Sequence, residues 1–239
     1  ELASNTLYTP FSGRSPKHLD PTSSYSSDET PYTYSIYEPL YQYHFLERPY
    51  RLIPRSAAEV VKPAYLDQDI NHALAPEVID ELHNPMDLPQ KGTRELTAED
   101  FVYSIKRMAN PRIIAPVYGT MVNYLPGLKD FAVQVRAEDK RLRADLKPSD
   151  RDLPFLDLRK FELKGVSAPD KYTLRLEVKG KYPQFPNWLA MTFFAPVPWE
   201  AEAFYAQKGM AKNNLSLNYW PVGTGPYMLV ESIENRKHV

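Results

Sequence analysis

The side chains best suited to bind a metal ion lie close together in one stretch: His72, Glu77, Asp80 and His83. Histidine nitrogens and carboxylate oxygens are common zinc ligands, but known sites place them at recognised spacings. The spacing of these residues matches no standard metal-binding pattern, and the chain has no cysteine that could add a thiolate. We therefore expect no metal and no other cofactor.

Two glycine-containing segments resemble catalytic loops only in part. Residues 165–169 (GVSAP) carry a serine as in a nucleophile elbow, but Pro169 stands where the tight turn needs glycine. Gly223 and Gly225 are followed by Pro226 and a strand-like pattern, which predicts a turn and not a phosphate-binding loop. Since no acid-base pair or catalytic triad stands out either, the sequence predicts that the protein is not an enzyme.

The composition is more typical of a recognition protein than of a catalyst. The 239 residues include 23 prolines and only 9 glycines, so we expect short elements joined by ordered irregular segments. The 17 tyrosines and 3 tryptophans supply flat amphipathic surface that suits a recognition cleft, although most of these rings are expected at sheet edges. The formal net charge of -1 favours neither nucleic acid nor an anionic membrane as a partner.

The clearest predicted element is a helix that begins at Thr97. Thr97 and Asp100 have the spacing of a capping box, in which each residue satisfies a free backbone group at the helix start. Phe101, Ile105 and Met108 recur at the spacing of one helix face. The sequence therefore predicts an amphipathic helix with one buried side.

The other elements are predicted from alternation, charge and proline positions. Residues 161–166 and 172–179 alternate apolar and polar, which predicts a β-hairpin with its turn at 168–170. Residues 136–160 carry many charges of both signs and are expected to form a solvated helix end and a surface loop. Shorter elements are a helix after Pro31 that breaks at Pro39, helices at 55–61, 76–83 and 201–207, and strands at 7–8 and 227–231.

Seven segments are spread in order over most of the chain: LDP at 19–21, IYEPLYQY at 36–43, LIPRSAAE at 52–59, LTAEDFVYSIKR at 96–107, VSAPDKYTL at 166–174, APVPWEA at 195–201 and PVGTGPY at 221–227. The last of them is the most specific. Together they resemble the bacterial extracellular solute-binding proteins of family 5, which serve peptide and nickel ABC importers.

The resemblance implies an α/β fold of the class II periplasmic-binding-protein type, in which two lobes close over a ligand by a hinge. Relatives are commonly much longer than this chain. Residues 1–239 would then be the N-terminal lobe, a mixed β-sheet flanked by short helices with proline-rich loops, with the second lobe absent. Residues 64–160 would be a more variable, partly helical subregion, and residues 64–90 show no strand pattern and no aromatic-Asp-Gly turn of the kind that the family usually carries.

The same resemblance implies the function. The protein would be the substrate-binding component of an ABC importer, which captures an oligopeptide or a similar small solute between its lobes and delivers it to a membrane-embedded permease. Catalysis and nucleic-acid binding would play no part. The location would be periplasmic or extracellular, and a segment outside this chain would be the place for any lipid anchor.

The resemblance also nominates ligand-binding residues. In peptide-binding relatives, the residues before the LDP element run along the ligand backbone like an added strand. The matching positions are Ser15, Pro16, Lys17 and His18. Pro16 has no N–H, so any such ladder is shortened. Further candidates near the cleft are Met191 and Thr192, which lead into APVPWEA, and Tyr41 and Tyr43.

Two alternatives remain open from the sequence. The first is an effector-sensing domain of a transcription regulator built on the same lobe, which an upstream DNA-binding segment in the gene would favour over a signal sequence. The second is a glycan-active enzyme that uses aromatic rings as sugar platforms and paired carboxylates in the cleft. Loss of glycan hydrolysis on mutation of such a pair would favour the enzyme.

Overall fold

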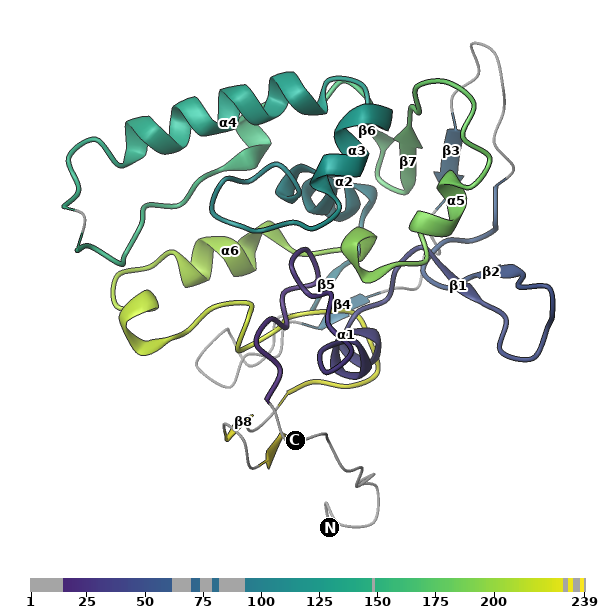
Figure 1. The fold of residues 1–239 in the computed structure, drawn as a ribbon, viewed down its shortest axis with the longest axis horizontal. Coiled ribbons are helices and arrows are strands. Elements are labelled where there is room, and N and C mark those ends of the chain that lie inside the picture. Colours follow the sequence, from purple (N-terminus) through teal and green to yellow (C-terminus); the bar gives the residue numbers. More distant parts are fainter. Residues whose placement is uncertain are drawn as a thin grey trace.

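The structure is a computed structural model that describes residues 15–61, 70–73, 79–81, 93–147, 149–229, 232–233 and 237–238. In this part of the chain, short helices and four small sheets are joined by long irregular segments (Figure 1). The mixed α/β character predicted from the sequence is confirmed. The elements are short because prolines repeatedly interrupt helix and strand hydrogen bonding.

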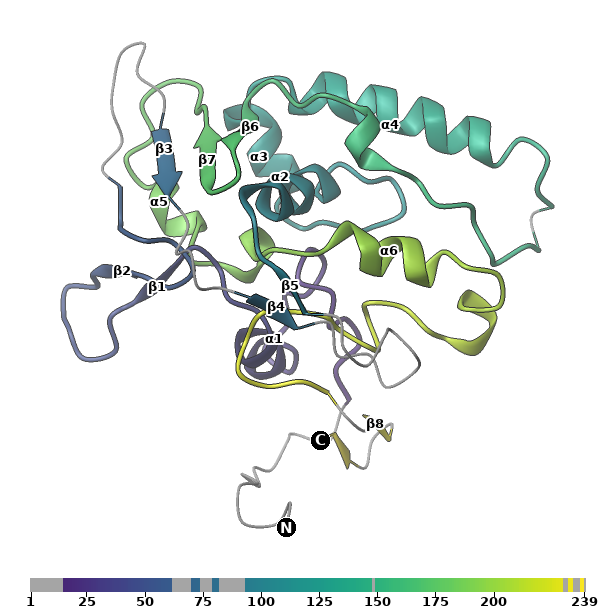
Figure 2. The ribbon, with the colours of Figure 1, turned by 180° about the vertical axis from the view of Figure 1, so that it is seen from behind.

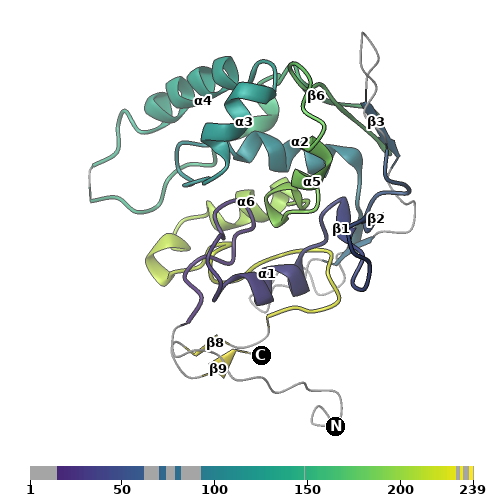
Figure 3. The ribbon, with the colours of Figure 1, turned by 45° about the vertical axis from the view of Figure 1, so that its right-hand side comes forward.

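The helices are spread across the molecule in three levels. α2 (Ala98–Arg107), α3 (Tyr118–Tyr124) and α4 (Leu128–Leu142) gather on one side, α1 (Thr30–Ile36) lies on the opposite side, and α6 (Trp199–Tyr205) lies between them (Figures 1 and 3). The remaining helical turns are α5 (Phe185–Trp188), η2 (Leu158–Lys160), η3 (Thr192–Phe194) and η4 (Ala211–Asn213).

The strands form antiparallel pairs. A three-stranded sheet has the order β3-β7-β6 and lies beside α2 (Figure 2), while β1 pairs with β2, β4 with β5 and β8 with β9. The strand bounds are β1 Tyr41–Tyr43, β2 Leu52–Pro54, β3 Ile70–Ala73, β4 Ile79–Glu81, β5 Thr93–Glu95, β6 Val166–Asp170, β7 Thr173–Leu176, β8 Ser232–Ile233 and β9 Lys237–His238.

Helix α2 is the centre of the larger hydrophobic core, as the sequence predicts. The capping box is present, with the Thr97 N–H donating to Asp100 Oδ2 at 2.9 Å. Phe101 and Ile105 are almost completely buried in the core. The Ala98 N–H donates to the carbonyl of Lys171, in the turn between β6 and β7, at 2.9 Å. The helix is therefore fixed both to the core and to the β6–β7 hairpin.

A smaller core joins α1 to α6 and to the segment that follows it. Tyr37 and Val222 are buried there. The Gly225 N–H donates to the Ile36 carbonyl at 2.7 Å, and a Cβ atom at Gly225 would lie only 2.4 Å from the carbonyl oxygen of Ser35. The glycine turn predicted from the sequence is confirmed, and its close approach to α1 explains why it needs glycine.

The charge-dense segment is a helix end followed by a surface loop, as predicted. α4 ends at Leu142, and the chain is irregular until η2. Asp139, near the end of α4, accepts hydrogen bonds from Arg112 at 2.6 Å and from Arg143 at 3.0 Å. Arg112 also donates to the Pro154 carbonyl at 2.6 Å. Ion pairs therefore fasten this loop to the body of the protein.

The predicted β-hairpin is present, but its position along the sequence is different. The first strand is β6, not residues 161–166, and the turn lies at Lys171 and Tyr172. Pro169, which the sequence reading placed in the turn, lies within β6. β6 is an edge strand of its sheet, and Pro169 lies at an irregularity where it has no partner in β7, so its missing N–H removes no hydrogen bond from the sheet.

The helices predicted after Pro31 and at 201–207 are confirmed as α1 and α6. The helical turns predicted at 55–61 are wrong, because this segment is irregular. The helix predicted at 76–83 is also wrong in its described part, where β4 pairs with β5. Short segments without a clear period take the structure that a pairing partner stabilises, and a partner distant in the sequence leaves no local pattern.

Two further differences concern strands. The sequence showed no strand within residues 64–90, yet the structure places β3 and β4 there. The last strand was predicted at 227–231, but residues 227–229 are irregular and β8 begins at Ser232. The strand predicted at 7–8 lies outside the described residues.

Candidate ligand-binding site

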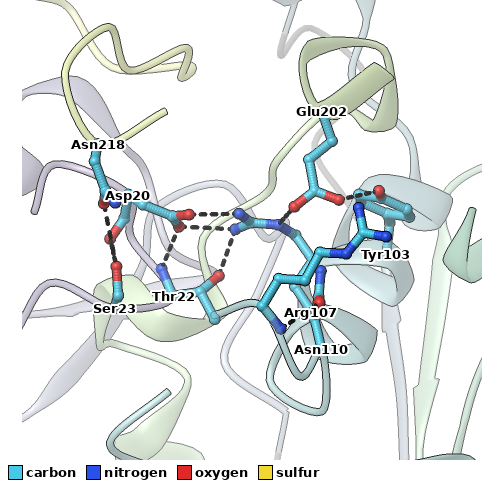
Figure 4. Close-up of polar contacts among 9 residues, drawn as sticks. Asp20, Thr22, Ser23, Tyr103, Arg107, Asn110, Glu202 and Asn218 are labelled. Atoms are coloured by element: carbon cyan, nitrogen blue, oxygen red, sulfur yellow. Dashed lines mark hydrogen bonds and ion pairs between the residues drawn. The ribbon is translucent and has the colours of Figure 1, made fainter. Parts of the chain in front are cut away.

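Arg107 is the hub of a buried polar network that supports the N-terminal segment (Figure 4). Its side chain is 1% exposed, and its Nη2 and Nη1 atoms donate to the two carboxylate oxygens of Asp20 at 2.6 and 2.9 Å. Its Nε donates to Glu202 of α6 at 2.6 Å, and the Thr22 hydroxyl accepts from Nη1. Tyr103 donates its hydroxyl to Glu202. The network therefore ties the LDP turn to both α2 and α6.

The charges in this network stabilise one another. Burial alone would lower the pKa of Arg107, but the carboxylates of Asp20 and Glu202 raise that pKa well above its ordinary value. Burial, and then the charge of Glu202, raise the pKa of Tyr103, so its hydroxyl keeps the proton that it donates. A buried cation held between hydrogen-bonded carboxylates is a rigid support, since removing any partner leaves an unpaired charge.

Glu29 organises the turn that follows Asp20. Its carboxylate is buried, with the residue 3% exposed, and it accepts hydrogen bonds from the main-chain N–H groups of His18 at 2.9 Å, Tyr25 at 3.1 Å and Ser26 at 3.2 Å. Burial raises the pKa of Glu29, but these donors outweigh it, so the pKa lies below its ordinary value. One carboxylate thus fixes both the His18 backbone and the Tyr25 backbone.

Two tyrosines pack against the segment that contains η3. The Tyr25 ring stacks on Phe193, with the ring centres 5.9 Å apart. The Tyr34 hydroxyl of α1 lies 3.5 Å from the Ala190 carbonyl and beside the Thr192 backbone. Both ends of the N-terminal region, the turn and the helix, therefore meet residues 190–193.

A third tyrosine completes this surface. Tyr43 follows Gln42 in β1, and Arg55 donates both to Gln42 Oε1 at 3.5 Å and to the Tyr34 carbonyl at 3.4 Å. Burial, and then Tyr43, raise the pKa of Tyr34. The exposed fractions are 70% for Tyr25, 37% for Tyr34 and 46% for Tyr43. We call these three residues, around the segment 190–193, the tyrosine face. It is a partly exposed aromatic surface built from separate parts of the chain.

Only some of the nominated residues before the LDP element lie at the surface. Pro16 is buried, Ser15 is half-buried, and Lys17 and His18 are exposed. The His18 N–H donates to Glu29, so an added-strand ladder would have to use other main-chain groups of the segment. Residues 15–18 are joined to the tyrosine face through Glu29 and Tyr25.

The other four nominated residues have different environments. Tyr43 belongs to the tyrosine face, and Met191 is half-buried beside that face. The side chain of Thr192 is buried, so only its backbone, which lies beside Tyr34, takes part in the face. Tyr41 is completely buried, and its N–H donates to the Leu189 carbonyl at 3.2 Å. Burial raises the pKa of Tyr41 to about 12. Tyr41 therefore supports the segment before Met191 from within the core.

Sequence reasoning missed Tyr25, Tyr34 and Arg55. Arg55 joins α1 to β1, because its Nη2 donates to the Tyr34 carbonyl at 3.4 Å and its Nη1 donates to Gln42 Oε1 at 3.5 Å. A helical projection of α1 could have found Tyr34, since the buried side of that helix is Thr33 and Ile36. Tyr25 lies in a turn and carried no such signal.

A hollow lies in another part of the described chain. It has a volume of about 720 Å³, lies between α2, η2 and α6, and is lined by charges of both signs. None of the eight nominated residues lines it. Within it, burial lowers the pKa of Lys106, and the Arg159 guanidinium lies 3.4 Å from the centre of the Trp199 ring. This hollow is separate from the tyrosine face.

The described residues contain no group of three or more histidine and acidic side chains placed to hold a metal ion. Of the metal candidates singled out in the sequence, Glu77 and His83, and the side chains of His72 and Asp80, lie outside what the structure describes. A search of the described helices also finds none with the length and apolar character needed to span a bilayer.

Comparison with solved structures shows the same fold in peptide-binding proteins. The pheromone receptor PrgZ, in a structure on its mode of peptide binding, has a TM-score of 0.64 and 18% identity, and the match covers 95% of this chain and 36% of PrgZ. Haemophilus influenzae OppA in complex with RPPGFSPFR has a TM-score of 0.61 and 21% identity, with 95% and 36% covered. Helicobacter pylori DppA with the peptide STSA has a TM-score of 0.60 and 18% identity, with 95% and 37% covered.

The predicted class II periplasmic-binding-protein fold is therefore confirmed, while this chain spans only a little over a third of the length of these structures. No curated protein sequence matches the chain. The effector-sensing alternative receives no support from these comparisons. The neighbours are binding proteins, which agrees with the expectation of a protein without catalytic activity at the level of the family.

The sequence profile described as "Bacterial extracellular solute-binding proteins, family 5 Middle" matches residues 91–239, which is more than half of the chain. This match and the shared fold confirm the resemblance found in the seven sequence segments. The chain belongs to family 5 of the bacterial extracellular solute-binding proteins.

Proposed function

We propose that this chain supplies the N-terminal lobe of the substrate-binding component of an ABC importer, and that its solute is a peptide. In this proposal residues 1–239 form the lobe and residues 64–160, which include α2, α3 and α4, are its more variable part. The peptide-bound states named for the structural neighbours support a peptide as the solute.

The observation that carries the proposal is the link between residues 15–18 and the tyrosine face. The Glu29 carboxylate holds the N–H of His18 and the N–H of Tyr25, and the Tyr25 ring stacks on Phe193. Main-chain groups recognise any peptide backbone, and flat tyrosine rings pack against varied side chains. Together they suit a ligand whose backbone is constant and whose side chains vary.

The proposal includes a second half of the site. Since the chain spans 36% of PrgZ and of the OppA structure, we propose that sequence outside these 239 residues supplies the opposing lobe. Affinity in a closing cleft comes from contacts on both sides, so this chain alone should bind weakly. The membrane-embedded permease of an importer would then receive the peptide.

The family is extracellular, which supports a periplasmic or extracellular location. A lipid anchor on a segment outside these residues belongs to the proposal. Delivery to a permease requires that the protein reaches the membrane, and an anchor of this kind would keep it close to that surface.

Isothermal titration tests the proposal. STSA and RPPGFSPFR should bind the chain weakly, and Tyr34→Ala and Tyr43→Ala should each weaken binding about twofold to tenfold, since an aromatic contact contributes about 0.5–1.5 kcal/mol. Val133→Ala, at an exposed position of α4, should leave binding unchanged. Sub-micromolar binding by this chain alone would contradict the half-site. Indifference to both tyrosine substitutions would contradict the tyrosine face.

A further inference from the structure

The loop between β1 and β2 presents large apolar side chains to solvent. This hairpin projects from the body of the molecule (Figures 1 and 2), and its loop, residues 44–51, carries Phe45 at 87% exposure, Leu46 at 77% and Tyr50 at 69%. We call residues 44–51 the hairpin tip. Adjacent exposed apolar residues of this size are uncommon on a soluble protein and usually mark an interaction site.

The hairpin tip is held in shape by its own hydrogen bonds. The His44 N–H donates to the Arg51 carbonyl at 2.8 Å, and the His44 Nδ1 accepts from the N–H groups of Leu46 at 3.3 Å and Glu47 at 3.2 Å. Arg48 Nη1 donates to the Glu47 carbonyl at 2.8 Å. These backbone groups already have hydrogen-bond partners within the loop. They can therefore enter a less polar environment without being left unpaired when water is removed.

The charges of the hairpin tip are mainly positive. Arg48 lies over the Tyr50 ring, 4.3 Å from its centre, and Arg51 forms an ion pair with Glu47 at 2.9 Å. Two arginines thus accompany one glutamate, although the whole chain has a net charge of -1. Aromatic rings with arginine beside them are typical of segments at a membrane interface, where the rings lie among the headgroups and the cations meet anionic lipid.

The size of the apolar surface argues against a protein partner. An aromatic side chain buries about 150–250 Å², so Phe45, Leu46 and Tyr50 together supply less than the roughly 800 Å² that each partner contributes to a stable protein interface. A lipid surface has no such requirement, because it deforms around a narrow projection. A few inserted side chains with basic neighbours give weak, reversible membrane binding.

We propose that the hairpin tip inserts Phe45 and Leu46 into the interface of an anionic lipid bilayer. Arg48 and Arg51 would lie at the level of the lipid headgroups. The contact would hold the protein at a membrane surface whether or not a solute is bound. The tip adjoins the tyrosine face, because the Tyr50 ring lies edge-on to Tyr43 with the ring centres 5.7 Å apart, but Phe45 and Leu46 are not part of that face.

Vesicle sedimentation and a fluorescent reporter test this directly. The chain should sediment with vesicles of equal parts phosphatidylcholine and phosphatidylglycerol. When these vesicles are added, the emission of Phe45→Trp should shift to shorter wavelength by more than that of the parent, which already has three tryptophans. The double variant Phe45→Ser/Leu46→Ser should lower the partition constant by about tenfold or more, since each side chain loses apolar burial. Ile114→Ser, at an 86% exposed apolar position outside the hairpin, is the matched control and should bind like the parent.

The electrostatic part has its own test. Arg51→Gln should weaken sedimentation with the anionic vesicles several-fold and change little with phosphatidylcholine alone. Circular dichroism should show that all variants stay folded, because the substituted side chains are exposed. The proposal is overturned if the parent chain does not sediment with anionic vesicles, or if the double variant sediments equally well. It is also overturned if the double variant abolishes a concentration-dependent dimer in lipid-free solution without changing lipid binding.

Discussion

Arg107 meets both carboxylate oxygens of Asp20, at 2.6 and 2.9 Å, although 87 residues separate the two along the chain. The pair is closed off from solvent and joins helix α2 to the LDP turn. Helix α2 therefore supports the segment that the proposed ligand site needs.

Replacement of Arg107 by alanine should lower the free energy of unfolding by about 3–5 kcal/mol, because the Asp20 and Glu202 carboxylates would remain buried without their cation. Urea denaturation measures this loss. Arg141→Ala is the control, since the Arg141 side chain is 69% exposed and its ion pair with Glu138 should contribute little. A loss as small for Arg107→Ala as for Arg141→Ala would show that the buried network does not support the fold.

The stability contributed by Glu29 should depend on pH. Its folded-state pKa lies below the ordinary value of 4.5, so ionised Glu29 stabilises the folded state above pH 4.5, and this contribution is lost as the pH falls through the lowered pKa. Glu29→Gln should therefore cost about 1–2 kcal/mol at neutral pH, and the difference from the parent should shrink below pH 4.5. Unfolding free energies of the parent and the variant, measured from neutral pH to below pH 4.5, test the direction of this pH dependence. A difference that grows in acid would contradict the assignment.

Replacement of two glycines by alanine should change the stability of the protein in opposite directions. Gly225→Ala brings a Cβ atom within 2.4 Å of the Ser35 carbonyl oxygen, so α1 must shift and stability should fall by about 2 kcal/mol or more. Gly119→Ala places its Cβ in open space within α3 and should stabilise by about 0.5–1 kcal/mol. Thermal unfolding of the two variants measures whether each substitution stabilises or destabilises the protein. Equal destabilisation would show that the close approach at Gly225 is not what decides its effect.

The start of α2 offers a separate test of local structure. Thr97→Ala removes the capping hydroxyl and should cost about 1 kcal/mol, whereas Thr97→Ser keeps the hydroxyl and should cost little. Chemical denaturation compares the two. If Thr97→Ser and Thr97→Ala lower the free energy of unfolding equally, the loss comes from the methyl group of Thr97 and not from its capping hydrogen bond.

Elements with strong local signals could be predicted from the sequence. The capping box at Thr97 and the regular apolar spacing after it identify α2, and the glycine turn before Pro226 was placed correctly. These features depend on nearby residues alone. The hairpin was found but misplaced, because the proline inside β6 is acceptable only at a sheet edge, and edge position is a property of the whole sheet.

The site was harder to predict than the fold. The Arg107 network joins residues from three distant segments, and the tyrosine face combines a turn, α1, β1 and the η3 segment. The residues around Met191 were nominated by resemblance, whereas Tyr25 and Tyr34 became visible only through their packing. Long-range contacts of this kind leave no periodic pattern in a single sequence.

The most direct test of the central claim is the response of backbone amide signals to a peptide. Nuclear magnetic resonance detects weak binding, so STSA can be titrated into this chain even if it carries only part of the site. We predict shifts in the amide signals of Lys17 and His18 and of residues 191–193, and little change along α4. Shifts confined to the hollow between α2, η2 and α6, with none near His18 or Thr192, would contradict the account.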